Sequence, residues 1–135
     1  MNNSAGLHLI MDVYVNDSSV LNSRNLTSMF RELANILDMT IIMGPEFKEV
    51  PVDAAILEES KQTGRFLDCG GVTGFCVIST SHMSAHCWEL ESFASIDIFS
   101  CKNFDSEKAE AYIIEKLGCT HVSKTVVKRT KPEKI

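Results

Sequence analysis

The chain has 135 residues, with 13 lysines and arginines against 18 aspartates and glutamates, so its formal net charge is −5. Hydrophobic residues make up 44% and charged residues 23%, which are the proportions of an ordinary globular protein. The acidic balance argues against a broad nucleic-acid-binding surface, and we expect no nucleic-acid partner. The length suits a single domain over residues 1–135.

Targeting and redox signals indicate a cytoplasmic protein. The first residues lack the charged-then-apolar pattern of a signal peptide. No apolar run approaches the roughly 20 residues that span a bilayer, so we expect no membrane partner. Five cysteines occur without a CxxC pair, and we interpret them as reduced thiols. Residues from about 128 to 135 are basic, which predicts a solvated tail.

The first part of the chain predicts a strand, a helix and a second strand. Residues 6–14, GLHLIMDVY, are mostly apolar and partly β-branched, as in a strand. Residues 22–37 predict a helix with one apolar face, formed by Leu26, Met29, Phe30, Leu33 and Leu37. Residues 39–43, MTIIM, predict a short buried strand that ends at Gly44-Pro45.

The segment from about 45 to 65 shows no clear period. We expect an irregular insertion there, with a helical turn or two within residues 52–61. Farther along, two apolar runs at 72–78 and 93–99 flank a polar middle. This pattern predicts two strands that lie on either side of a reactive edge.

The chain then predicts a second helix and a closing strand. Asp105 is a candidate N-cap for a helix through Leu117, and Gly118 suits a left-handed C-terminal residue. Residues 120–128 predict a strand. The order gives an α+β fold, a two-layer α/β sandwich whose mainly antiparallel sheet carries two amphipathic helices on one face. The uncovered sheet face would need a partner, which predicts a homodimer.

Most of the reactive side chains fall between residues 71 and 101, in GVTGFCVISTSHMSAHCWELESFASIDIFSC. His82 and His86 have the spacing of zinc ligands on a helix, but the flanks are typical of strands. In a strand these two residues would lie about 13 Å apart, so we expect no metal site. A serine hydrolase is also disfavoured, because Ser81 lies outside any G-x-S-x-G pattern.

The same stretch resembles the core of the bacterial and archaeal S-adenosylmethionine decarboxylases. Those proteins carry Glu-Ser-His-x-x-x-His-Thr-Trp-Pro-Glu, followed by a cysteine at the end of the next strand. Ser81, His82, His86 and Trp88 fall in register with this motif, and Cys101 follows at the family's spacing. Three further segments match family patterns: GLHL at 6–9, GVTG at 71–74 and IDIFSC at 96–101.

The resemblance implies that the chain makes its own cofactor, a covalent pyruvoyl group, by breaking the bond between Thr80 and Ser81. The Ser81 hydroxyl attacks the preceding carbonyl to give an ester, and loss of the serine α-proton expels the upstream chain. The pyruvoyl carbonyl then takes the substrate amine and withdraws electrons as carbon dioxide leaves. By the same resemblance His86 removes the α-proton, Thr73 assists cleavage, and Cys101 returns a proton to the product.

The resemblance also implies how a substrate is held. Phe66 and Trp88 match an aromatic pair that sandwiches the substrate purine, although core packing explains an aromatic residue equally well. Bacterial members of the family build each site from two subunits. A homodimer that binds a small molecule in a pocket shared by both copies is therefore expected.

Two of the positions at which the chain departs from the family motif bear directly on function. Thr80 stands where the family has the glutamate before the cleaved bond. Leu90 stands where the family has a glutamate that binds the ribose hydroxyls, and a leucine cannot accept those hydrogen bonds. Either Glu89 or Glu91 would have to substitute, or the substrate is not a nucleoside.

Three functions are compatible with these residues. The first is a pyruvoyl-dependent S-adenosylmethionine decarboxylase that feeds spermidine and polyamine synthesis. The second keeps the cofactor and acts on arginine or ornithine, as Leu90 suggests. The third is an uncleaved, non-catalytic homologue that binds a partner, as Thr80 suggests.

Overall fold

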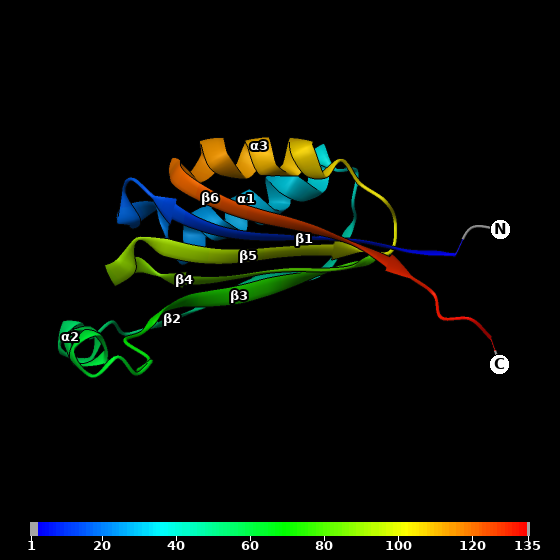
Figure 1. Cartoon of the computed structure of the whole chain (residues 1–135). Helices are drawn as coiled ribbons and strands as arrows, with labels where there is room; N and C mark the ends of the chain where they lie inside the picture. Colours follow the sequence, from blue (N-terminus) through cyan, green and yellow to red (C-terminus); the bar gives the residue numbers. More distant parts are fainter. Residues whose placement is uncertain (1–2, 135) are drawn as a thin grey trace.

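The computed structural model describes residues 3–134. Its centre is a six-stranded antiparallel sheet with the strand order β2-β3-β4-β5-β1-β6 (Figure 1). The strands are β1 (Ser4–Val15), β2 (Ile41–Val50), β3 (Gly71–Ile78), β4 (Ser81–Trp88), β5 (Phe93–Ser100) and β6 (Cys119–Thr130). The predicted α+β class with a mainly antiparallel sheet is confirmed.

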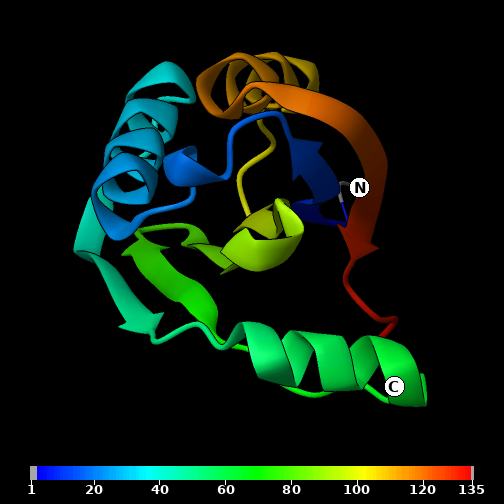
Figure 2. The same ribbon diagram turned by 90° about the vertical axis from the view of Figure 1, so that its left-hand side faces the viewer.

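Two amphipathic helices, α1 (Ser23–Ile36) and α3 (Ser106–Leu117), cover the same face of the sheet (Figures 1 and 2). Each begins at a side chain that accepts hydrogen bonds from the free backbone N–H groups of the first turn: Asn22 for α1 and Asp105 for α3. Gly118 ends α3 in the left-handed conformation. Both helices therefore form where the sequence predicts them.

The alternation of each strand divides the sheet into a covered face and an open face. On β5, for example, Ala94, Ile96 and Ile98 are buried under the helices, while the residues between them are only partly buried. The helices complete the core with side chains such as Phe30 and Ile113, which are fully buried. The polar residues of β4 and β5, namely His82, Ser84, His86, Ser95 and Asp97, fall at the alternate positions on the open face. Neither α1 nor α3 covers this face (Figure 2).

The segment from 45 to 65 is more regular than the sequence predicted. Strand β2 does not end at Gly44-Pro45 but continues to Val50, with register shifts against β3 around the proline. Proline is tolerated there because β2 is an edge strand with one side free of ladder hydrogen bonds. A helix, α2 (Ala54–Thr63), follows and is capped by Asp53 and Gly64.

Helix α2 lies apart from the other two helices and buries none of its residues (Figure 2). Its weak amphipathic pattern explains why the sequence predicted only a turn or two. Two short 3-10 helices, η1 (Ser18–Val20) and η2 (Glu89–Glu91), complete the connections. Residues 128–130, expected in the basic tail, belong to β6. Among residues 3–134, no helix is long and apolar enough to cross a membrane.

Candidate active site

The residue before the predicted cleavage point is held firmly at the turn between β3 and β4. The carbonyl oxygen of Thr80 accepts a hydrogen bond of 2.8 Å from the backbone N–H of Cys101. The Thr80 hydroxyl accepts a second, also of 2.8 Å, from the fully buried hydroxyl of Ser100. An N–H group aimed at a carbonyl oxygen can stabilise the negative charge that develops there under nucleophilic attack.

Ser81 itself has an unusual backbone conformation. Its φ angle is +153°, in a region that residues with a side chain rarely adopt. Such a conformation costs on the order of 1–3 kcal/mol and persists where the surrounding structure imposes it, often at functional sites. The serine predicted to be the nucleophile is therefore one of three non-glycine residues with positive φ in the described chain.

The cysteine beside this turn is fixed by the backbone of β1. A Cβ atom at Gly6 would lie 2.0 Å from the carbonyl oxygen of Ser100 and 2.6 Å from the Cα atom of Cys101. The φ angle of Gly6, +107°, also favours glycine. The close approach to β1 fixes the backbone at Cys101, and the hydrogen bond from its N–H joins it to Thr80. We name Thr80, Ser81 and Cys101 the cleavage turn.

The open face beside the cleavage turn carries several side chains that sequence reasoning did not place in the site. Phe99 pairs with His82 on one side and with His8 on the other. His8 Nε2 lies 2.8 Å from Asp97 Oδ1, and the guanidinium carbon of Arg129 lies 4.2 Å from the centre of the Phe99 ring. The signal that could have revealed them is the recurrence of polar residues at alternate positions of predicted strands.

The second group of predicted residues lies farther along the same strands. The Thr73 hydroxyl and Nδ1 of His86 form a short hydrogen bond between neighbouring positions of β3 and β4. His86 also faces Ser95 on β5, whose hydroxyl donates a 2.6 Å hydrogen bond to Asp12. The ring centres of His86 and Trp88 are 6.5 Å apart. We name Thr73, His86 and Trp88 the histidine row.

The structure does not bring the histidine row to the cleavage turn of the same chain. Ser81 pairs with Ser100, whereas His86 pairs with Ser95, five positions along an extended ladder. At about 3.3 Å per residue, these positions are about 17 Å apart. Proton transfer requires contact at about 3 Å, directly or through one water. Within one chain, Ser81 and Cys101 are together and His86 and Thr73 are together, but the two pairs are separate.

A small cavity of about 180 Å³ adjoins the histidine row. Its lining combines the row with the end of β2 and the segment before β3: Val50, Asp68, Gly70, Gly71, Val72, Thr73, His86, Cys87 and Trp88. Phe66, predicted to hold a substrate ring, is 77% exposed and does not line it. Glu89 and Leu90 lie in η2 directly after Trp88, and Leu90 is 38% exposed.

Comparison with known proteins assigns the family. A sequence model of the family described as S-adenosylmethionine decarboxylase matches residues 7–130. The chain belongs to this family. Among similar proteins, the S-adenosylmethionine decarboxylase proenzyme of Caldicellulosiruptor saccharolyticus is 34% identical over 92% of this chain and 87% of its own. The proenzyme of Acetivibrio thermocellus is 30% identical over 94% of this chain and 90% of its own.

A solved structure shows the same fold. The adenosylmethionine decarboxylase from Aquifex aeolicus VF5 superposes with a TM-score of 0.70, covering 99% of this chain and 98% of that one. The two sequences are 21% identical, so this likeness supports the fold alone. The resemblance on which the sequence analysis relied is confirmed at the level of the family.

The cysteines of this S-adenosylmethionine decarboxylase family member differ sharply in their environments. All five are free thiols, and Cys101 is the exposed one. Burial raises the pKa of Cys76 to about 11 and that of Cys87 to about 12. Buried thiols of this kind remain protonated at neutral pH and behave as small apolar residues. Cys101, in the cleavage turn, is therefore the most accessible of the five cysteines.

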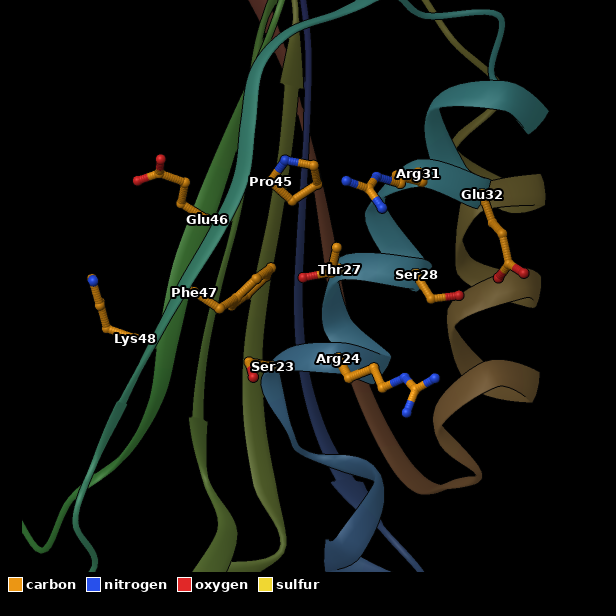
Figure 3. A pocket seen from close by; sticks show the side chains of 10 residues that line it. All are labelled: Ser23, Arg24, Thr27, Ser28, Arg31, Glu32, Pro45, Glu46, Phe47 and Lys48. Atoms are coloured by element: carbon orange, nitrogen blue, oxygen red, sulfur yellow. The ribbon is translucent and has the colours of Figure 1, made fainter.

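A larger hollow lies elsewhere. It has a volume of about 670 Å³ and lies between α1 and β2, on the helix side of the sheet (Figure 3). Its lining includes Arg24, Arg31 and Lys48 but no residue of the cleavage turn or the histidine row. Within the described part of the chain, no three His, Cys, Asp or Glu side chains gather as a metal site would require.

Proposed function

We propose that the chain is a self-processing S-adenosylmethionine decarboxylase that serves spermidine and polyamine synthesis in the cytoplasm. Family membership supports the reaction, and one local observation supports its chemistry in this chain. That observation is the cleavage turn, where the Thr80 carbonyl is already hydrogen-bonded by the N–H of Cys101 and precedes a serine with a strained backbone. Replacement of the family glutamate by Thr80 leaves this arrangement intact.

Chain cleavage uses groups that the turn supplies. The Ser81 hydroxyl attacks the Thr80 carbonyl carbon, and the N–H of Cys101 stabilises the oxygen as it gains negative charge. The peptide C–N bond breaks, which leaves an ester between Thr80 and the serine oxygen. His86 then removes the α-proton of residue 81, the bond between Cβ and the ester oxygen breaks, and the upstream chain leaves with Thr80 as its terminal carboxylate. Hydrolysis of the resulting dehydroalanine releases ammonia and leaves a pyruvoyl group.

The residues around the turn fit a pyruvoyl group at position 81. The group would begin the downstream chain at the start of β4, next to the exposed thiol of Cys101. When formed, it supplies a carbonyl that withdraws electrons from the bond that breaks in the substrate. Cys101 holds the proton that the product carbon requires.

We further propose that two copies of the chain complete each site. His86 and Thr73 lie about 17 Å from the cleavage turn of their own chain, so they must act on another copy. A two-fold axis between two open faces, near the paired residues Ser84 and Asp97, would place the cleavage turn of one copy over the histidine row of the other. Two sheets packed face to face lie about 10 Å apart, which side chains can bridge.

Two features of the open face favour this arrangement. Tyr14, Phe75 and Val127 lie on it and are 51%, 41% and 42% exposed, so the open face carries large apolar side chains that a second copy would cover. The 180 Å³ cavity is also smaller than the roughly 300–1,000 Å³ of typical small-molecule sites. A second copy would enlarge it, with Trp88 and Phe66 around the purine and Glu89 near the sugar.

The substrate assignment can be tested by carbon dioxide release. Purified protein is incubated separately with carboxyl-labelled S-adenosylmethionine, arginine and ornithine, with Ser81→Ala as the control. We expect release from S-adenosylmethionine only, and none from the control. Release from arginine or ornithine alone would overturn the substrate and favour the altered pocket at Leu90. No release from any of them, with an uncleaved chain, would support a non-catalytic homologue.

A further inference from the structure

The imidazole of His82 lies against the hydroxyl of the residue that is cleaved. Nδ1 of His82 is 3.1 Å from Oγ of Ser81. A neutral imidazole offers one ring nitrogen as an acceptor, and a serine hydroxyl can donate to it. The Phe99 ring lies at 5.8 Å from the imidazole and at 69° to it, a contact that limits how the ring can turn. The two polar atoms therefore lie within hydrogen-bonding distance of each other at the start of β4.

Attack by the serine requires a proton acceptor at that oxygen. A hydroxyl is a weak nucleophile until a base removes its proton, and imidazole is the side chain best suited to this near neutral pH. His86 lies about 17 Å away in the same chain, and its role is the later removal of the α-proton. Among the hydrogen bonds of the described residues, Ser81 Oγ is joined to His82 and not to the thiol of Cys101.

A hydroxyl next to an imidazole is not by itself a catalytic pair. The chain contains the same contact in β6, where Thr120 Oγ1 lies 3.0 Å from Nδ1 of His121. Neither residue there has a positive φ angle. At Ser81 the contact coincides with a strained backbone and with a preceding carbonyl that the N–H of Cys101 already polarises. The coincidence of the three features distinguishes the cleavage turn.

We infer that His82 is the general base of the first step of self-cleavage. Its Nδ1 takes the proton of Ser81 Oγ as the oxygen bonds to the Thr80 carbonyl carbon. The imidazolium then gives that proton to the nitrogen of residue 81 as the C–N bond breaks. One C–O bond replaces one C–N bond, the proton moves from oxygen to nitrogen, and no co-reactant is consumed. The inference rests on the proposed self-processing at Ser81.

The test separates ester formation from the later steps. In a His86→Ala background the ester cannot eliminate, and hydroxylamine cleaves it to leave a hydroxamate on Thr80. Hydroxylamine is used at concentrations where the cleavage rate no longer depends on it, so that ester formation limits the rate. The compared proteins are His86→Ala alone and His86→Ala combined with His82→Asn, His82→Gln or His121→Asn. Asparagine keeps an acceptor near the position of Nδ1 but cannot take up the proton.

We expect both His82 variants to be cleaved at least about 100-fold more slowly than the parent, the usual contribution of a general base. The His121→Asn variant should match the parent. An unchanged rate in either His82 variant, with its thermal unfolding intact, would overturn the inference. If the His86→Ala parent is never cleaved between Thr80 and Ser81, and the unmodified chain also stays whole, it is the proposed self-processing that fails.

Discussion

Two inactive variants should restore each other if each site is built from two copies. Ser81→Ala removes the residue that is cleaved, and His86→Ala removes the base that acts on the α-proton. Neither homodimer should process its chains. In a mixed dimer, the Ser81 of the His86→Ala chain would meet the intact His86 of its partner, and that one site would be complete.

The expected recovery of activity follows from the sheet register together with random assembly of the two chains. Ser81 and His86 pair with Ser100 and Ser95, and the resulting separation of about 17 Å excludes contact within a chain. With equal amounts and random assembly, half of the dimers are mixed and each carries one complete site. About a quarter of all sites, and about half of the His86→Ala chains, should then become active.

The assay is co-expression of two differently tagged chains, followed by mass measurement of each chain and by decarboxylation. A matched control pairs Ser81→Ala with Cys101→Ala, because both changes fall in the cleavage turn and no combination restores a complete site. This control should decarboxylate no faster than Cys101→Ala alone. An uncleaved His86→Ala chain in isolated mixed dimers would refute the shared site.

Three further predictions concern stability and processing. Burial raises the pKa of the Cys87 thiol to about 12 from 9.0. As pH rises, this thiol therefore loses its proton in the unfolded state before it does so in the folded state. Its contribution to the free energy of unfolding is complete below pH 9 and then falls by up to about 1.4 kcal/mol per pH unit. Urea unfolding at pH 8, 9 and 10 should show a shallower fall for Cys87→Ala. Gly6→Ala should lower the free energy of unfolding by at least about 1–3 kcal/mol, because its Cβ would meet the Ser100 carbonyl; an unchanged urea midpoint would contradict this. Thr73→Val should slow self-cleavage, measured on gels over time, because it removes the hydroxyl that holds His86, whereas Thr73→Ser should retain most of the rate.

Much of the fold could be predicted because its signals are local. The caps at Asn22 and Asp105 and the apolar stripes behind them define α1 and α3, and alternation defines β5. Strand β2 was predicted too short because proline normally ends a strand, and its tolerance here depends on an edge position that only the assembled sheet reveals. Helix α2 was underestimated because it buries nothing.

For the candidate site, the sequence proposes residues but does not give their arrangement. The motif identifies Ser81, His86 and Cys101, but a linear pattern does not tell which of them share a strand end. In an extended strand His82 lies four positions and Ser81 five positions from His86, and both separations are too long for direct contact within one chain. His8 and Asp97 remained outside the prediction because their pairing depends on the register of β1 against β5.

Denaturing mass spectrometry of the purified, unmodified chain tests the self-cleavage most directly. The intact chain has a mass of 15.0 kDa. We predict two fragments, one that ends at Thr80 and one that begins with a pyruvoyl group at position 81, and a single intact species for Ser81→Ala. A single 15.0 kDa species from the unmodified chain after prolonged incubation would contradict the proposed mechanism.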